Sequence, residues 1–151
     1  LATKALAPAG AIILITGAGG VYKQMLVQSG AGEALAEVFL QFQLLPPLMA
    51  FTLAALIRIL QGSATVAMIT AAGLLAPALP ELALTAPQTA LLVLSIAAGA
   101  STLSHVNDSG FWLVNDYLLM DESTTLRTWS MMTILLSLTA LVMVLLLYPL
   151  V

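Results

Sequence analysis

The sequence predicts an all-α polytopic membrane protein with a re-entrant helical hairpin and a discontinuous transmembrane helix. Its composition is 61% hydrophobic and only 7% charged, whereas about 25% of the residues in a soluble domain are charged. A water-soluble fold built from this chain would have too few polar side chains to cover its surface, so lipid is the expected solvent. With 151 residues, the chain can form roughly four or five membrane segments of about 20 residues each.

The charged and reactive side chains exclude several functional classes. The net charge is −3 and there is no basic run, so no nucleic-acid partner is expected. The chain has no cysteine and a single histidine, which excludes disulfides and metal sites built from thiolates or several histidines. No nucleotide-binding loop with a supporting fold is present, so no cofactor is expected. The chain begins with leucine and lacks a signal-peptide pattern, and we expect it to be a piece of a longer protein.

The first part of the chain predicts a membrane helix over residues 5–28 and an interfacial segment over residues 30–44. Glycines within residues 17–20 argue against one continuous helix, because glycine costs about 1 kcal/mol relative to alanine in a helix interior.

Residues 47–80 predict a re-entrant hairpin. Pro46 and Pro47 suit the first turn of a helix. The apolar run that follows, residues 48–60, rises about 20 Å as a helix, which is short of the roughly 30 Å hydrocarbon core. Small polar residues at 61–65 separate it from a second short apolar run at 66–76. Two half-length helices that meet at a polar tip indicate a hairpin; one kinked spanning helix is the alternative.

Residues 87–120 predict a broken helix. Residues 82–104 carry no charged side chain, and the segment SHVNDSG at 104–110 follows before the apolar residues 111–114. Polar groups at membrane depth are costly and are usually tolerated only where they line a cavity or pathway. Residues 121–125 predict a loop. A last transmembrane helix is expected over residues 126–149, with interfacial anchors at Trp129 and Tyr148.

The two interrupted elements predict a binding site. Secondary transporters bind anions at the N-termini of half-helices and ions at unwound carbonyls. Hydroxyl and amide side chains at both interruptions suit a polyhydroxylated anion. The predicted substrate-binding residues are Gly62, Ser63, Thr65, His105, Asn107, Asp108, Ser109 and Gly110.

Three ionisable residues have alternative roles. Asp108 and His105 are candidates for proton coupling, although Asp108 also suits a helix N-cap and His105 suits a packing role. Arg58 is either the charge partner of an anionic substrate or a side chain that snorkels to an interface. The small polar residues Ser63 and Thr65 are equally compatible with close helix packing. No catalytic residue or metal ligand is predicted, so an enzyme is not expected.

Two motifs make the chain resemble the gluconate permease family. The first is SHVNDSGFWLV at residues 104–114, and the second is QGSATVA at residues 61–67. Residues 10–23 and 126–130 are also similar, so the resemblance spans nearly the whole chain. Residues 115–125 depart from the family pattern.

The resemblance implies the C-terminal inverted-repeat half of a secondary transporter in the bacterial inner membrane. It places Ser63 and Thr65 at the hairpin tip, and Asn107, Asp108 and Ser109 in the break of the discontinuous helix. The implied activity is proton-coupled uptake of gluconate or a related sugar acid. The implied partners are that anion, protons, the missing N-terminal half, the lipid bilayer and a second copy in a homodimer. A sodium-coupled carboxylate transporter of the same fold and a non-transporting membrane subunit are the alternatives.

Overall fold

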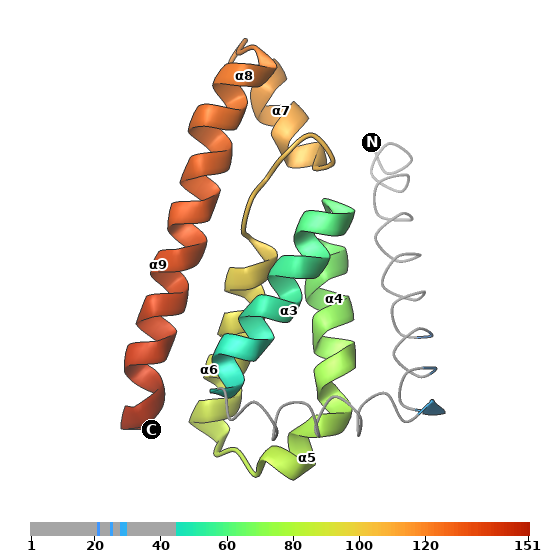
Figure 1. Cartoon of the computed structure of the whole chain (residues 1–151), viewed down its shortest axis with the longest axis vertical. Helices are drawn as coiled ribbons and strands as arrows, with labels where there is room; N and C mark the ends of the chain where they lie inside the picture. The colour runs from blue at the N-terminus through green and yellow to red at the C-terminus, as the bar shows by residue number, and fades with distance from the viewer. Residues whose placement is uncertain (1–20, 22–24, 26–27, 30–44) are drawn as a thin grey trace, which may run out of the picture.

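The computed structural model describes residues 21, 25, 28–29 and 45–151 of the chain. The predicted interfacial segment 30–44 and most of the predicted helix 5–28 lie outside these residues. Within the described part, every regular element is helical, as the composition predicts (Figure 1).

Helices α3 (Pro46–Gln61) and α4 (Ala64–Leu75) lie side by side and run in opposite directions (Figure 1). They form a helical hairpin. Only Gly62 and Ser63 separate them, so the tip is shorter than expected and Thr65 lies in the first turn of α4. Gly62 adopts φ 79° and its N–H donates to the Arg58 carbonyl, while Ser63 Oγ accepts from the Val66 N–H.

Helix α4 continues through the 3-10 turn η1 (Ala76–Ala78) into the short helix α5 (Leu79–Leu82). Helix α6 (Ala86–Ala100) then begins with a capping box, in which Thr85 and Gln88 each accept from the other's backbone N–H. Helix α7 (Ser109–Tyr117) starts after eight non-helical residues, 101–108.

The sequence places the end of the first half of the broken helix at Ser104, and this boundary is wrong, because α6 ends at Ala100. Leu103 adopts the left-handed conformation with φ 39°, which an α-helix cannot accommodate. Backbone groups released by the early ending bond the side chains of Arg58, Ser130 and Thr133, and no local sequence pattern reveals these partners.

The C-terminal helical stretch Glu122–Leu150 is longer than predicted. It consists of α8 (Glu122–Thr125), the π-helical turn η2 (Leu126–Ser130), α9 (Met131–Leu147) and the 3-10 turn η3 (Tyr148–Leu150). The loop predicted over residues 121–125 is wrong, because the Asp121 carboxylate accepts from the Thr124 N–H and caps a helix that begins at Glu122.

Two helical stretches in the described part of the chain are long and apolar enough to cross a membrane: Ala64–Leu82 and Glu122–Leu150. Helices α3 and α6 are apolar but shorter. Two such stretches fit the membrane protein that the composition predicts.

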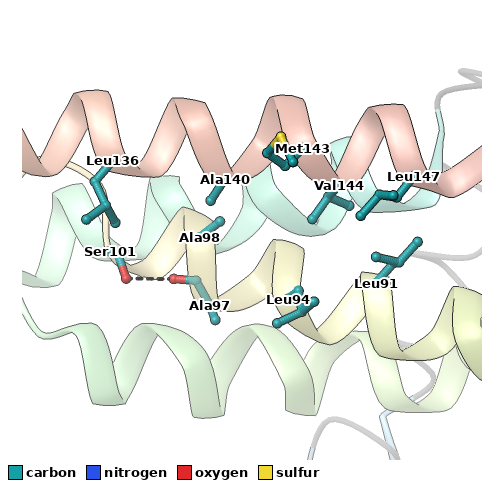
Figure 2. A pocket seen from close by; sticks show the side chains of 10 residues that line it. All are labelled: Leu91, Leu94, Ala97, Ala98, Ser101, Leu136, Ala140, Met143, Val144 and Leu147. Atoms are coloured by element: carbon teal, nitrogen blue, oxygen red, sulfur yellow. Dashed lines mark hydrogen bonds between the residues drawn. The ribbon is translucent and has the colours of Figure 1, made fainter.

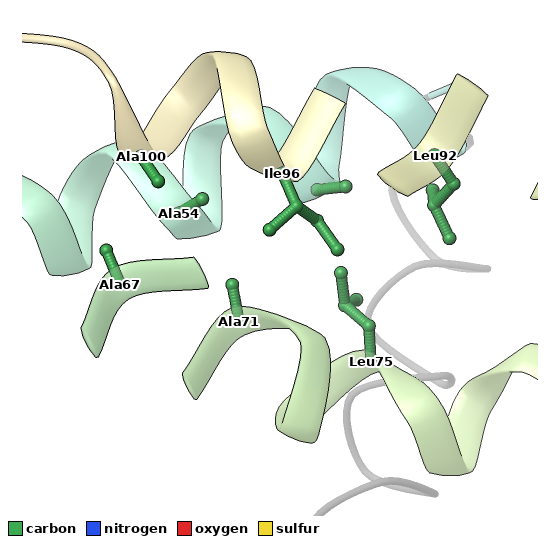
Figure 3. Packing of buried hydrophobic residues seen from close by; sticks show 8 residues of the cluster. Ala54, Ala67, Ala71, Leu75, Leu92, Ile96 and Ala100 are labelled. Carbon is green, nitrogen blue, oxygen red and sulfur yellow. The ribbon is translucent and has the colours of Figure 1, made fainter. Parts of the chain in front are cut away.

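Small residues hold α3, α4 and α6 close together (Figure 3). A Cβ added to Gly99 of α6 would stand 2.2 Å from the Phe51 carbonyl oxygen of α3, so only glycine fits at this crossing. Helix α9 packs against α6 and α3 through a second cluster. The first cluster contains Ala50, Ala54, Ala67, Ala71, Leu75, Leu92, Ile96 and Ala100.

Candidate functional site

The hairpin tip contacts the break between α6 and α7. A Cβ added to Gly62 would stand 2.4 Å from the backbone oxygen of Asn107, so the tip and the break touch through backbone. His105 Nε2 lies 3.0 Å from the Ile59 carbonyl oxygen near the end of α3. The two interrupted elements, which the sequence predicts separately, therefore form one region of the structure.

The contacts of His105 define its tautomer. A carbonyl oxygen only accepts hydrogen bonds, so Nε2 carries the hydrogen in the bond to Ile59. Nδ1 lies 3.4 Å from the backbone nitrogen of Asn107 and accepts from that N–H. The imidazole links the end of α3 to the break.

Arg58 is buried and directs its guanidinium to three acceptors, one in the hairpin tip and two in the break. Nη2 forms an ion pair with the Asp108 carboxylate, Nη1 donates to the Gly62 carbonyl, and Nε donates to the Thr102 carbonyl over 3.2 Å. The side chain does not extend away from the fold, as snorkelling would require. Its hydrogen bonds satisfy carbonyls that the hairpin tip and the break leave without a helical partner.

Asp108 serves both as a helix cap and as a charge partner. Its Oδ1 accepts from the Gly110 N–H over 3.0 Å at the start of α7, and its Oδ2 accepts from Arg58 and from Ser104 Oγ. The N-cap role and the role in a charged site, left open by the sequence, are therefore compatible.

The C-terminal helix contributes three side chains to the break. Trp129 Nε1 donates to Ser104 Oγ over 2.8 Å, Thr133 Oγ1 accepts from the Ser104 N–H over 3.1 Å, and Ser130 Oγ donates to the Ser104 carbonyl. Trp129, expected at the membrane interface, thus bonds within the protein. Sequence reasoning missed this group, although Ser130, Thr133 and Ser137 form a small polar stripe on an apolar helix.

The remaining predicted residues surround this contact. Thr65, Asn107 and Ser109 are exposed, and Ser63 and Gly110 are partly buried. The Thr65, Asn107 and Ser109 side chains make no hydrogen bond to any described residue, so they are open to a ligand. Among the described residues, no group of three or more histidine, cysteine, aspartate or glutamate side chains is placed to hold a metal ion.

An apolar cavity of about 350 Å³ lies between α6 and α9 (Figure 2). Its lining is aliphatic except for Met143 and Ser101, and the Ser101 hydroxyl donates to the Ala97 carbonyl of the preceding helix α6. This cavity offers little to a polar anion. The polar chemistry of the described part is concentrated at the contact between the tip and the break.

An apolar helical chain with a buried ion pair between the hairpin tip and the break fits an α-helical membrane protein with an internal charged site. The chain belongs to the GntP family of permeases, because the model of that family, described as "GntP family permease", matches residues 1–151.

Three relatives illustrate the similarity. A gluconate permease of Pseudomonas aeruginosa is 48% identical over 97% of this chain and 32% of its own length. The low-affinity gluconate transporter of Escherichia coli is 50% identical over 85% of this chain and 29% of its own length. The Gnt-II system L-idonate transporter of the same organism is 46% identical over 89% of this chain and 30% of its own length. The chain thus spans about a third of the length of these relatives. No solved structure matches it significantly.

Proposed function

We propose that this chain is the C-terminal part of a secondary active transporter that takes up gluconate or a related sugar acid, together with a proton, across the bacterial inner membrane. Membership of the permease family and the names of the relatives support transport of a sugar-acid anion. The observation that carries the proposal is the buried ion pair between Arg58 of the hairpin and Asp108 of the break.

The anion binds where the hairpin tip meets the break. Its carboxylate pairs with the Arg58 guanidinium, and its hydroxyl groups bond the open side chains of Thr65, Asn107 and Ser109. Ser63, Gly62 and Gly110 border the same region. The N-terminus of α7 adds the partial positive charge of a helix end, which favours an anion.

Competition for Arg58 couples the anion to a proton. Each of the three guanidinium nitrogens has one protein acceptor, and in this proposal the substrate carboxylate competes with Asp108 for the N–H groups of Arg58. A displaced Asp108 carboxylate would be a poorly solvated charge beside the substrate anion, which is unfavourable. Protonation of Asp108 removes that charge, so a proton and an anion bind together more readily than either alone.

His105 is the second proton-coupling group in this proposal. Protonation of Nδ1 replaces the acceptor of the Asn107 N–H with a donor and breaks that contact. The hairpin then loosens from the break on the side of Ile59. Protonation at either residue therefore weakens the attachment of the tip.

The wider architecture belongs to the same proposal. The hairpin is re-entrant, α6 and α7 form a discontinuous transmembrane helix, and the described chain is one inverted-repeat half. The other half, in the part of the relatives' length that this chain does not span, completes the site. The chain alone is accordingly expected not to transport.

The test measures uptake of labelled gluconate into proteoliposomes that contain the full-length transporter carrying this sequence. An inward proton gradient should drive uptake by the wild type, and Asp108→Asn should abolish it. Asp116→Asn is the matched control, because this exposed aspartate lies on the same helix α7 away from Arg58. Absence of uptake by the wild type would contradict gluconate as substrate. Uptake that needs sodium and survives a proton uncoupler would contradict proton coupling.

A further inference from the structure

Ser104 is the residue through which the C-terminal helix reaches Asp108. It is almost fully buried and bonds α9 and η2 through its hydroxyl, its N–H and its carbonyl. The same hydroxyl contacts Asp108 Oδ2, the oxygen that pairs with Arg58. The resemblance to the permease family gives no role to Ser104 or Trp129, and neither residue is among the exposed polar side chains proposed to bind the substrate.

Donor and acceptor chemistry gives this chain of bonds a direction. The indole N–H of Trp129 only donates, so Ser104 Oγ accepts in that bond. A serine hydroxyl has one hydrogen, and Asp108 as a carboxylate only accepts, so that hydrogen lies toward Asp108. The bonds run from Trp129 through Ser104 to Asp108, and each polarises the next.

We propose that Ser104 is a positioning residue for proton coupling: aligned by Trp129, it donates to Asp108 and stabilises the charged carboxylate that pairs with Arg58. This inference rests on the proposed function and deepens it, because it makes the last helix part of the proton-binding site. The arrangement opposes protonation of Asp108 until the Ser104 bond turns or breaks. A shift of η2 relative to the break would do this.

The surroundings of Asp108 give Ser104 this role. Helix α3 presents one charged group to it, Arg58, and within the break His105 bonds Ile59 instead. Helix α7 offers the Gly110 N–H. Among the described residues, η2 and α9 face the break with neutral side chains, Trp129, Ser130 and Thr133, and all of them bond Ser104. The influence of the last helix on Asp108 therefore passes through Ser104.

The first readout is the pH dependence of uptake. Ser104→Ala removes one donor to the charged form of Asp108, so Asp108 should accept its proton at higher pH. The pH of half-maximal uptake should rise by about one unit, the shift that corresponds to one hydrogen bond to a charged group. Trp129→Phe keeps most of the ring packing and should shift the pH profile in the same direction by a smaller amount. This second variant tests the proposal even if Ser104→Ala does not fold.

The matched control is Ser137→Ala. Ser137 is also a buried serine that joins the last helix to α6, through a 2.8 Å bond to the Ala98 carbonyl, but it has no connection to Asp108. It should lower stability without moving the pH profile. A Ser104→Ala profile that coincides with that of Ser137→Ala would overturn the proposal.

A second readout does not depend on transport. In the full-length protein labelled with 5-fluorotryptophan, the ¹⁹F resonance that disappears in Trp129→Phe belongs to Trp129. It should titrate with pH in the wild type, and this titration should be lost in both Asp108→Asn and Ser104→Ala. A Trp129 resonance that does not titrate, or titrates unchanged in Ser104→Ala, would overturn the role of Ser104. A titrating resonance in a protein without gluconate uptake would support Ser104 and contradict the proposed substrate.

Discussion

The guanidinium of Arg58 and the carboxylate of Asp108, 50 positions apart in the chain, form an ion pair that joins the hairpin α3–α4 to the first turn of α7. Both side chains are largely buried. Burying two charges is costly, but removal of one partner costs more, because it leaves the other charge buried and unpaired. The pair therefore fixes the position of the tip against the break.

A double-mutant cycle should detect this coupling. Asp108→Asn leaves the Arg58 charge uncompensated and should destabilise the protein by about 3 kcal/mol or more. Adding Arg58→Gln to Asp108→Asn removes the stranded charge, so the double variant should have a higher apparent Tm than Asp108→Asn alone. Thermal unfolding of the purified wild type, Asp108→Asn, Arg58→Gln and the double variant in detergent measures these effects. Asp116→Asn, at an exposed position, should leave the apparent Tm unchanged, and additive effects of the two single substitutions would contradict the coupling.

Gly62→Ala should separate the hairpin tip from the break. The new Cβ would lie 2.4 Å from the backbone oxygen and 2.5 Å from the Cβ of Asn107, and the φ of 79° costs a non-glycine residue about 1–2 kcal/mol in addition. Because backbone and a Cβ atom form the obstacle, a rotamer change cannot relieve it. We expect a lower apparent Tm and loss of uptake.

Ala83→Gly is the control for Gly62→Ala. It makes the reverse substitution at another residue with a left-handed backbone, in an exposed turn with φ 46°. It relieves backbone strain and adds chain entropy to the unfolded state, so the net change in stability should stay within about 1 kcal/mol. A Gly62→Ala protein as stable and active as this control would contradict the close contact at the tip.

Much of this arrangement could be predicted from local chemistry. The tandem prolines mark the start of α3, the glycine and serine at 62–63 mark the tip, and the polar run at 104–110 marks the interruption. Each signal depends on residues that are adjacent in the chain. The pairing of Arg58 with Asp108 could not be predicted in this way, because it depends on how the hairpin packs against α6.

The end of α6 also could not be predicted from the local sequence. The run without charged residues extends to Ser104, so the sequence favours helix up to that residue, yet the helix stops at Ala100. The carbonyls of Thr102 and Ser104 accept from Arg58 and Ser130, and the Ser104 N–H donates to Thr133. Partners on two other helices stabilise the break, and their positions are known only once the fold is known.

The start of the last helical stretch should respond to acid. The pKa of Asp121 is lowered from its ordinary value of 3.8, chiefly because the Thr124 backbone N–H donates to its carboxylate. The folded-state pKa lies below the unfolded one, so the cap is fully present above pH 3.8 and is lost as the pH falls through the folded-state value. The ¹³Cα shift of Thr124 should move away from its helical value in that acidic range. Asp121→Asn retains a capping oxygen that does not ionise, and the same pH-dependent step in this variant would contradict the assignment.

Ser109→Ala should weaken substrate binding without weakening the fold. Its hydroxyl is exposed at the first position of α7 and has no partner among the described residues, whereas the cap of this helix is Asp108. Loss of one hydrogen bond to a substrate hydroxyl, about 0.5–1.5 kcal/mol, corresponds to a rise in KM of roughly 2- to 12-fold. Initial rates of gluconate uptake against concentration measure this rise, and the apparent Tm should stay that of the wild type. Ser123→Ala is the control, because this serine is equally exposed but lies on α8. An unchanged KM in Ser109→Ala would remove Ser109 from the site and leave the tip as the main source of hydroxyl contacts.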